Sequence, residues 1–448
     1  MRHTLLVAFA LMWVAAVAQA QSSQPAPSEL LTLDQLEQMA LQANPTLIQA
    51  AATVNAARNR ARQAGAWPNP VVGYTGAEIA PGEVIRLGEH GVFAEQTIPL
   101  GGKLKLDRAV FAQTAAVAES FVDLQRQRVL STVRTLFYEA LTADRRVQVR
   151  ERLAGLALEA VDVSRQLYNT GAADRPDVLE SEIEARRSAL DLEAARNSRF
   201  AIWQRIAAVV SSPSLTPRPL DGSIESAIPE LERASTLQAV LDQNGAVRAA
   251  RAEVLRTQAV TGQARRVTYP DLFLKGGANY NRERLETNLK PVGWEAAFEA
   301  GVSLPLFNRN VAGVAAARAE ETRAQSELNR LQLSLRSQMA GVFEGYLTAL
   351  RASEEYRQQL LPRAEEAYQL YLSRYRAAAS AYPQVLISQR TLFQMNTEYL
   401  DSLEHAWRAA LRLQGFLAGE GLDVPGGMTT PMDPVVARSA ASRGAEKR

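Results

Sequence analysis

Cysteine is absent from this 448-residue chain, and histidine occurs only three times. The lack of cysteine excludes disulfide bonds, thiolate metal sites, a cysteine nucleophile and a lipid-modified N-terminal cysteine. The three histidines, His3, His90 and His405, are too scattered along the sequence to indicate a metal-binding cluster. We therefore expect no bound metal and no cofactor.

An excess of charge of one sign is also missing. The chain has 50 Lys and Arg against 48 Asp and Glu, a net charge of +2, whereas nucleic-acid binding requires a clustered basic field. No nucleophile–histidine–acid constellation is present, which argues against an exported hydrolase. Asp174 with Asp177, and Glu365 with Glu366, are better explained as solvated charges at helix ends than as acid/base pairs. We expect no catalytic residue and no enzymatic activity.

Long hydrophobic runs occur only at the N-terminus. Arg2 and His3 precede an apolar run, Leu5–Val17, and a small-residue site ends at Ala20, which predicts a secretory signal peptide over residues 1–20. The run is too short to span a bilayer, and no later stretch reaches the ~18 apolar residues of a membrane helix. Any membrane crossing must therefore be made by strands. Residues 21–28 predict a flexible leader and residues 422–448 a disordered tail.

The mature chain repeats itself. Trp67-Pro68 is echoed by Tyr269-Pro270, and Ile98-Pro99-Leu100 by Leu304-Pro305-Leu306. A period of about 200 residues is too long for a solenoid and indicates an internal duplication. We predict a first repeat over residues 21–231 and a second over 232–421.

Both repeats predict the same succession of elements. Good helix formers dominate the long segments, and Pro362 alone should kink one of them. Each repeat should contain a first helix, two short strands, a very long helix and a last helix. In the first repeat the three predicted helices are Leu33–Ala64, about Leu104–Tyr168 and Val178–Val210. In the second repeat they are Ala234–Arg265, about Val311–Tyr375 and Val385–Leu417. Helices of this kind are also compatible with an ordinary long coiled coil.

The strand pairs decide the class of fold. They cover roughly Val71–Ala80 with Gly91–Leu100, and Asp271–Asn281 with Gly293–Leu304. About ten residues is the length of a tilted transmembrane strand, and apolar and polar residues alternate from Trp294 onwards. Two hairpins of a soluble sheet would alternate equally well. In a membrane, four strands cannot close a barrel, which needs at least eight, so several chains would have to share one.

The duplication, the proline-flanked strand pairs and the two Tyr…Val-Leu breaks resemble the outer-membrane efflux family typified by TolC. Glu95–Lys103 (EQTIPLGGK) resembles the branch paired with heavy-metal pumps of the resistance-nodulation-division class. The resemblance implies a mainly α fold in a homotrimer. Its helices would form an α-barrel across the periplasm, continuous with a shared twelve-stranded transmembrane β-barrel.

The function implied by this resemblance is a passive exit duct in the outer membrane of a Gram-negative cell. The duct would serve an inner-membrane pump through a periplasmic membrane-fusion adaptor, with heavy-metal cations among the candidate substrates, and would touch outer-membrane lipid but no nucleic acid. The alternative is a periplasmic coiled-coil adaptor or scaffold without a channel. Retention in the outer membrane would favour the channel, and release without detergent the adaptor.

The resemblance also points to the two helix breaks, Tyr168–Leu179 and Tyr375–Leu386. In relatives these turns dock the adaptor, and inner helices beside them constrict the channel. The matching docking positions are Gly171, Ala172, Ala173, Asp174, Ala378, Ala379 and Ser380.

A periplasmic gate is implied at Asp177, Tyr375, Gln384 and Ile387. A tyrosine hydroxyl donating to a carboxylate would form a latch between Asp177 and Tyr375. Alternatively, Asp177 is the N-cap of a helix that starts at Val178. Gln384 and Ile387 stand where some relatives carry carboxylates, so we do not expect an acidic cation gate.

Overall fold

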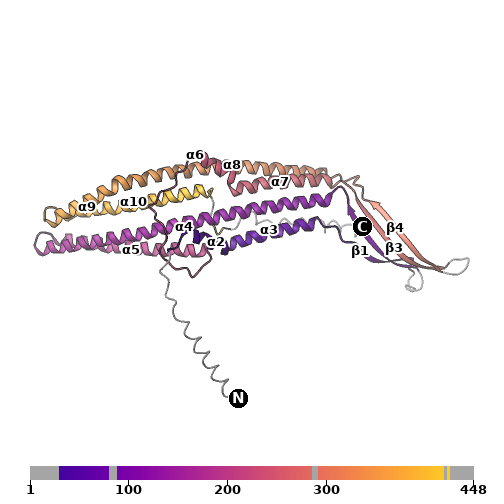
Figure 1. The fold of residues 1–448 in the computed structure, drawn as a ribbon, viewed down its shortest axis with the longest axis horizontal. Helices are drawn as coiled ribbons and strands as arrows, with labels where there is room; N and C mark the ends of the chain where they lie inside the picture. The colour runs from indigo at the N-terminus through magenta and orange to yellow at the C-terminus, as the bar shows by residue number, and fades with distance from the viewer. Residues whose placement is uncertain (1–29, 80–87, 285–290, 418–420, 424–448) are drawn as a thin grey trace, which may run out of the picture. The chain divides into compact units, whose positions relative to one another are not determined.

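The computed structural model describes residues 30–79, 88–284, 291–417 and 421–423. The expected signal peptide, the leader and almost all of the expected tail lie outside these residues. The described elements of the first half are α2 (Leu33–Ala43), α3 (Pro45–Ala64), β1 (Val71–Ala77), β2 (Glu89–Pro99), α4 (Lys103–Asn169) and α5 (Arg175–Val209) (Figure 1). Those of the second half are α6 (Arg233–Gln243), α7 (Gly245–Arg266), β3 (Asp271–Arg284), β4 (Pro291–Val302), α8 (Val311–Glu355), a π-helical turn (Tyr356–Leu360), α9 (Leu361–Arg376) and α10 (Tyr382–Gln414). The order of elements therefore recurs in the second half.

Contacts divide the chain into two compact units, and each unit takes segments from both sequence halves. The hairpin unit comprises the described residues up to Gln42, Val133–Ile228 and Leu350–Glu404. The strand unit comprises the described residues of Ala43–Thr132, of Pro229–Ala349 and from His405 onwards. No helix within the described ranges is both long enough and apolar enough to cross a membrane.

The first helix of each half was predicted as one element and is in fact two. In the first half the break lies at Asn44, whose extended backbone and side-chain oxygen cap α3 through the N–H of Thr46 at 3.0 Å. Pro45 follows at the first position of α3, where a missing N–H costs nothing. In the second half Asn244 plays the same part, accepting from the N–H groups of Ala246 and Val247.

The long helices follow the sequence prediction closely. α4 begins and ends within one residue of its predicted bounds. In the second half the π-helical turn Tyr356–Leu360 separates α8 from α9, directly before Pro362. A proline inside a helix lacks one N–H and crowds the preceding turn, so the local widening accommodates it.

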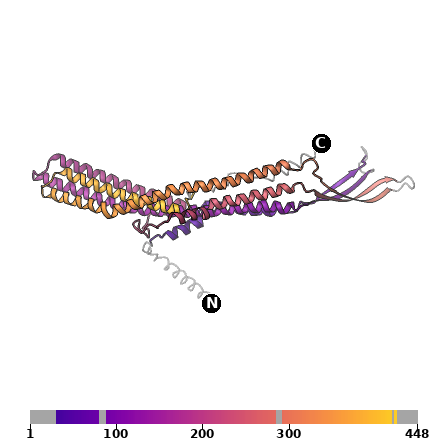
Figure 2. The same ribbon diagram turned by 90° about the horizontal axis from the view of Figure 1, so that it is seen from above.

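The four strands form one antiparallel sheet in the order β1-β2-β3-β4 (Figures 1 and 2). The two halves meet where β2 pairs with β3, from Glu89↔Asn281 to Pro99↔Asp271. β1 and β4 are the outer strands, and each has a single strand neighbour among the described residues. Their outer rows of backbone groups are therefore open to a further strand.

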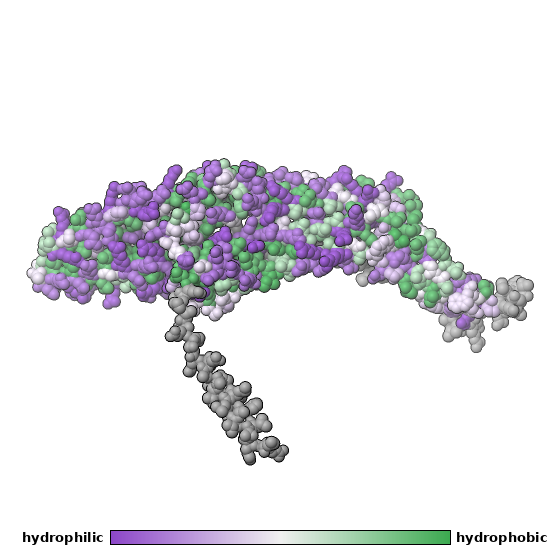
Figure 3. Space-filling model, viewed as in Figure 1, coloured by the Kyte–Doolittle hydropathy of each residue, from purple (hydrophilic) through white to green (hydrophobic). Residues whose placement is uncertain are grey.

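Large apolar side chains are exposed along this sheet. Trp294 and Phe298 are four residues apart on β4, so they lie on one face of the strand. The ring of Tyr280 on β3 packs edge-on against that of Trp294, with centroids 5.6 Å apart. The other exposed large apolar residues of the strands are Val71, Val72, Tyr74, Val92, Val292 and Val302. On the face shown in Figure 3, hydrophobic residues gather over the strands.

The cap at Asn244 gives a first prediction. Asn244→Ala should lower the free energy of unfolding by about 1–2 kcal/mol, because two N–H groups of α7 lose their acceptor and the Phe416 carbonyl loses its donor. Asn244→Ser keeps a capping oxygen and should lose less. Urea unfolding of the detergent-solubilised protein, followed by circular dichroism, measures both losses, and equal losses would contradict the capping role.

Candidate functional site

The two helix turns lie beside each other at one end of the hairpin unit (Figures 1 and 2). The first turn, between α4 and α5, contains Gly171 with φ +74°. The N–H groups of Ala172 and Ala173 both donate to the Leu167 carbonyl, at 2.8 and 3.3 Å. This arrangement closes the C-terminus of α4. Gly171, Ala172 and Asp174 are exposed and Ala173 is half-buried, so the four predicted docking residues lie at the surface.

The second turn, between α9 and α10, has the same geometry built with alanine. Ala378, which corresponds to Gly171, has φ +54°. Its N–H donates to the Tyr375 carbonyl, and that of Ala379 donates to the Arg374 carbonyl, both at 2.9 Å. A left-handed backbone costs an L-residue about 1–2 kcal/mol. The second turn is therefore strained where the first is not.

Ser380 and Gln384 are used locally at the start of α10. The Ser380 hydroxyl donates to Gln384 Oε1 at 2.6 Å, and the Ala381 N–H donates to the same oxygen at 3.1 Å. Because α10 begins at Tyr382, this side chain satisfies an N–H that the helix leaves unpaired. Ile387, the other predicted gate residue on α10, is exposed.

Tyr375 is buried, and its hydroxyl donates to Ser164 Oγ at 3.2 Å. Burial raises the pKa of Tyr375, the bond to Ser164 lowers it, and the negative charge of Asp177 raises it again. The Asp177 carboxylate is thus near enough to act through its charge. A phenol has one proton, so with Ser164 as acceptor the predicted Asp177–Tyr375 bond is not formed in this structure.

The alternative prediction for Asp177, an N-cap before Val178, is wrong. α5 begins at Arg175, and Asp174 holds the N-cap position without a side-chain capping bond. Pro176 is tolerated in the first turn of the helix, which is why the helix extends further back than predicted. Asp177 lies in that first turn, where a negative charge favours the helix dipole.

Three tyrosines spaced seven residues apart lie at the centre of the core beneath the turns. Tyr368 and Tyr375 on α9 and Tyr382 on α10 pack with side chains of α4 such as Leu153 and Val163. The hydroxyl groups of Tyr368 and Tyr382 have no hydrogen-bond partner among the described residues. Burial raises the pKa of Tyr368 to about 12 and also raises that of Tyr382. Tyr368 and Tyr382 were not identified from the sequence. For Tyr368, the seven-residue spacing from Tyr375 on α9 is the signal that places both on one helix face.

Ion pairs join the two helical hairpins around this core. Arg376 pairs with Glu159, and Arg152 pairs with Glu365 at 2.9 Å. Arg390 of α10 lies 2.9 Å from Glu184 of α5, whose side chain is buried. Glu365, expected to be a solvated charge, therefore has a partner on α4.

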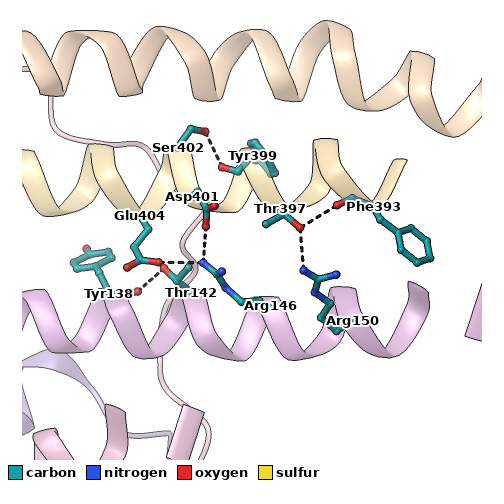
Figure 4. A network of polar contacts seen from close by, with 10 residues as sticks. All are labelled: Tyr138, Thr142, Arg146, Arg150, Phe393, Thr397, Tyr399, Asp401, Ser402 and Glu404. Atoms are coloured by element: carbon teal, nitrogen blue, oxygen red, sulfur yellow. Dashed lines mark hydrogen bonds and ion pairs between the residues drawn. The ribbon is translucent and has the colours of Figure 1, made fainter. Parts of the chain in front are cut away.

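Further along α4, arginines reach α10 (Figure 4). Arg146 donates to Asp401 at 2.8 Å and to Glu404 at 3.2 Å, and Arg150 donates to Thr397 Oγ1 at 3.1 Å. An arginine shared between two carboxylates fixes the register of the two helices more firmly than a single exposed pair would.

The packed helices of the hairpin unit end in two exposed turns that backbone hydrogen bonds close. In the described part of the chain, no group of three or more His, Asp or Glu could hold a metal ion. The sequence model of the outer membrane efflux protein family matches residues 36–211 and 236–419. The chain belongs to this family, whose members are transport channels and not enzymes.

Two relatives of this chain are named for metal resistance. The cobalt-zinc-cadmium resistance protein CzcC of Cupriavidus metallidurans is 28% identical over 392 residues, which are 86% of this chain and 90% of CzcC. The nickel-cobalt-cadmium resistance protein NccC of Alcaligenes xylosoxydans is 26% identical over 308 residues, 66% of each chain. The solved structure of CusC, described as forming a transmembrane channel, superposes with a TM-score of 0.74 at 17% identity, covering 89% of this chain and 96% of CusC. The fold is that of the TolC-like channels.

Exchanging alanine and glycine at the equivalent positions of the two turns should have opposite effects on stability. Ala378→Gly should raise the free energy of unfolding by about 1 kcal/mol by relieving the left-handed backbone, whereas Gly171→Ala should lower it by about 1 kcal/mol. A Cβ atom on Gly171 meets nothing within 4 Å. The stability lost in Gly171→Ala therefore comes from backbone conformation and not from a steric clash. Thermal unfolding of both variants measures the pair, and a destabilised Ala378→Gly variant would contradict the assignment.

The buried tyrosines predict an alkaline loss of stability. The pKa of Tyr368 is about 10 in the unfolded chain and about 12 in the folded protein. The contribution of Tyr368 to the free energy of unfolding is therefore complete below pH 10 and is lost as the pH rises from 10 to 12. Tyr368→Phe should reduce this loss. At neutral pH it should leave stability unchanged or higher, because it removes a hydroxyl without a partner.

Tyr375→Phe provides the matched comparison. It breaks the bond to Ser164 and should lower the free energy of unfolding by about 1 kcal/mol at neutral pH. Unfolding measured in parallel at pH 7 and pH 11 separates the two variants. A Tyr368→Phe variant that loses as much stability at pH 7 as Tyr375→Phe would overturn the assignment of the unpartnered hydroxyl.

Proposed function

We propose that this chain is the subunit of a homotrimeric outer-membrane channel with a shared twelve-stranded transmembrane β-barrel. The observation that carries the proposal is the four-stranded sheet with two outer edges. Inside a bilayer every backbone N–H and C=O group must find a partner, and only a closed barrel gives each strand two neighbours. Four strands are too few to close, and three copies supply twelve.

The surface of the sheet supports a place in lipid. Exposed Trp294 and Phe298 on β4, with Val72 and Tyr74 on β1, give the outer strands an apolar surface that water does not favour. Aromatic residues such as Tyr280 and Trp294 are typical of the two membrane–water interfaces. In this proposal, residues 1–20 direct export, and the protein is held in the outer membrane by its strands, without a lipid anchor.

The channel serves as the passive exit duct of a tripartite efflux system. A periplasmic membrane-fusion adaptor would dock on the two turns, at the exposed residues Gly171, Ala172, Asp174, Ala378 and Ala379 and the half-buried Ala173 and Ser380. An inner-membrane pump of the resistance-nodulation-division class would deliver the substrate. Heavy-metal cations are the proposed cargo, and the support for this is the metal resistance named for CzcC and NccC.

Reconstitution in planar bilayers tests this function. The purified protein should produce discrete conductance steps whose size is independent of protein concentration, and liposomes containing it should admit zinc ions to an enclosed zinc-sensitive dye. Protein that is recovered from the periplasm without detergent and produces no conductance steps would refute the channel and favour the adaptor or scaffold.

The gate assigned to Asp177, Tyr375, Gln384 and Ile387 predicts a change in conductance. Tyr375→Phe combined with Asp177→Asn should raise single-channel conductance, because the variant loses both the bond from α9 to α4 and the charge beside it. Tyr168→Phe, at an exposed tyrosine near the end of α4, is the matched control and should leave conductance unchanged. Equal conductance in the double variant and the control would remove these residues from the gate.

A further inference from the structure

Phe307 is the most exposed large hydrophobic residue described in the chain. Its side chain is 102% exposed, in the connection between β4 and α8. Leu304 and Leu306 beside it are also exposed. An aromatic ring held wholly in water at the end of an ordered strand suggests that it contacts something outside the single chain.

The duplication identifies the residue equivalent to Phe307. Ile98-Pro99-Leu100 aligns with Leu304-Pro305-Leu306, so the next residue in each half, Gly101 and Phe307, correspond. In the same way Trp67-Pro68 aligns with Tyr269-Pro270. Gly101 and Phe307 lie in the connections that follow β2 and β4, and Trp67 and Tyr269 lie in the connections that precede β1 and β3.

Within the chain, the first half meets the second half through one member of each pair. Gly101, with φ +70°, lies against the ring of Tyr269 so closely that a Cβ atom would be 2.6 Å from Tyr269 Cγ. Here the ring fills the space and only glycine fits. A second junction, from the second half to the first half of a neighbouring copy, would place Phe307 on Trp67.

The surroundings of Trp67 have room for the Phe307 side chain of a neighbouring copy. Trp67 is 63% exposed and lines a cavity of about 430 Å³ in the strand unit, together with Ala64, Pro99, Leu104 and Phe111. In the second half, Arg266 covers the equivalent ring, with its guanidinium carbon 4.6 Å from the Tyr269 centroid. Ala64 occupies the corresponding place before Trp67 and leaves that ring uncovered.

The strands give independent support for the same junction. Ile98 and Pro99 of β2 pair with Leu272 and Asp271 of β3, across the boundary between the halves. The equivalent residues, Leu304 and Pro305, lie beyond the end of β4 and have no strand partner among the described residues. They are in position to pair with the start of β1 in another copy.

We infer that Phe307 of one copy inserts into the cavity lined by Trp67 of the next copy. The partner is a second copy of this chain, and the contact is head-to-tail, so three copies form a closed ring with three such contacts. Glycine against a tyrosine makes the junction within a chain, and phenylalanine in a cavity makes the junction between chains. The inference rests on the proposed trimer, because a monomer has no such neighbour.

Disulfide trapping tests the contact cleanly, because the natural chain has no cysteine. Trp67→Cys and Phe307→Cys are introduced singly into two versions of the chain that carry tags of different size, and the two are co-expressed. Mild oxidation of outer membranes should yield a covalent dimer that contains both tags. The double variant Trp67→Cys/Phe307→Cys should yield dimers and trimers on a denaturing gel, which reduction abolishes.

Two controls keep the result interpretable. Trp67→Cys paired with Leu333→Cys, at an exposed residue of α8, should give no cross-link. Phe307→Ala, with the cavity left empty, should lower the temperature at which the trimer dissociates, whereas Leu333→Ala should not lower it as much. A trimeric mass without the Trp67–Phe307 cross-link would refute the contact and leave the channel intact. A monomeric mass would refute both.

Discussion

The open edges of the four-stranded sheet are the constraint on which the account depends. β1 and β4 leave rows of N–H and C=O groups without a strand neighbour, and in a hydrocarbon environment each such group costs several kcal/mol. In the proposed membrane channel, the sheet therefore needs further copies of the chain to pair its edges. Because the order of elements recurs along the chain, β4 is the second strand of the second half as β2 is of the first. A neighbour can then be added by the same kind of junction that β2 and β3 already form, and Phe307 marks where it would lie.

Much of this fold was predictable from the sequence. The strands begin and end within a few residues of prediction, because prolines and glycines bound them and their lengths are short. α4 was placed to within one residue at either end for a similar reason, with Gly101-Gly102 before it and Gly171 after it. The breaks at Asn44 and Asn244 were missed because the pattern on either side is helical. At both breaks the capping asparagine signals a new helix, with Pro45 after Asn44 as a second signal in the first half, and this local chemistry outweighs helix propensity.

The site was only partly accessible to sequence reasoning. The turns themselves follow from local signals, and Ala378 shows what happens when the favoured glycine is absent: the geometry persists at a cost. The partner of Tyr375 could not be predicted, since Ser164 is 211 residues away and only the packing of α9 on α4 brings them together. Buried tyrosines without hydroxyl partners lower the stability of the core beside the turns.

The mass of the protein extracted by detergent from purified outer membranes tests the central claim most directly. Light scattering, corrected for bound detergent, gives the number of chains in the particle. We expect three chains, which together supply the twelve strands of a closed barrel. A single chain, released from cells without detergent, would contradict it, because a lone four-stranded sheet cannot satisfy its edges in a bilayer.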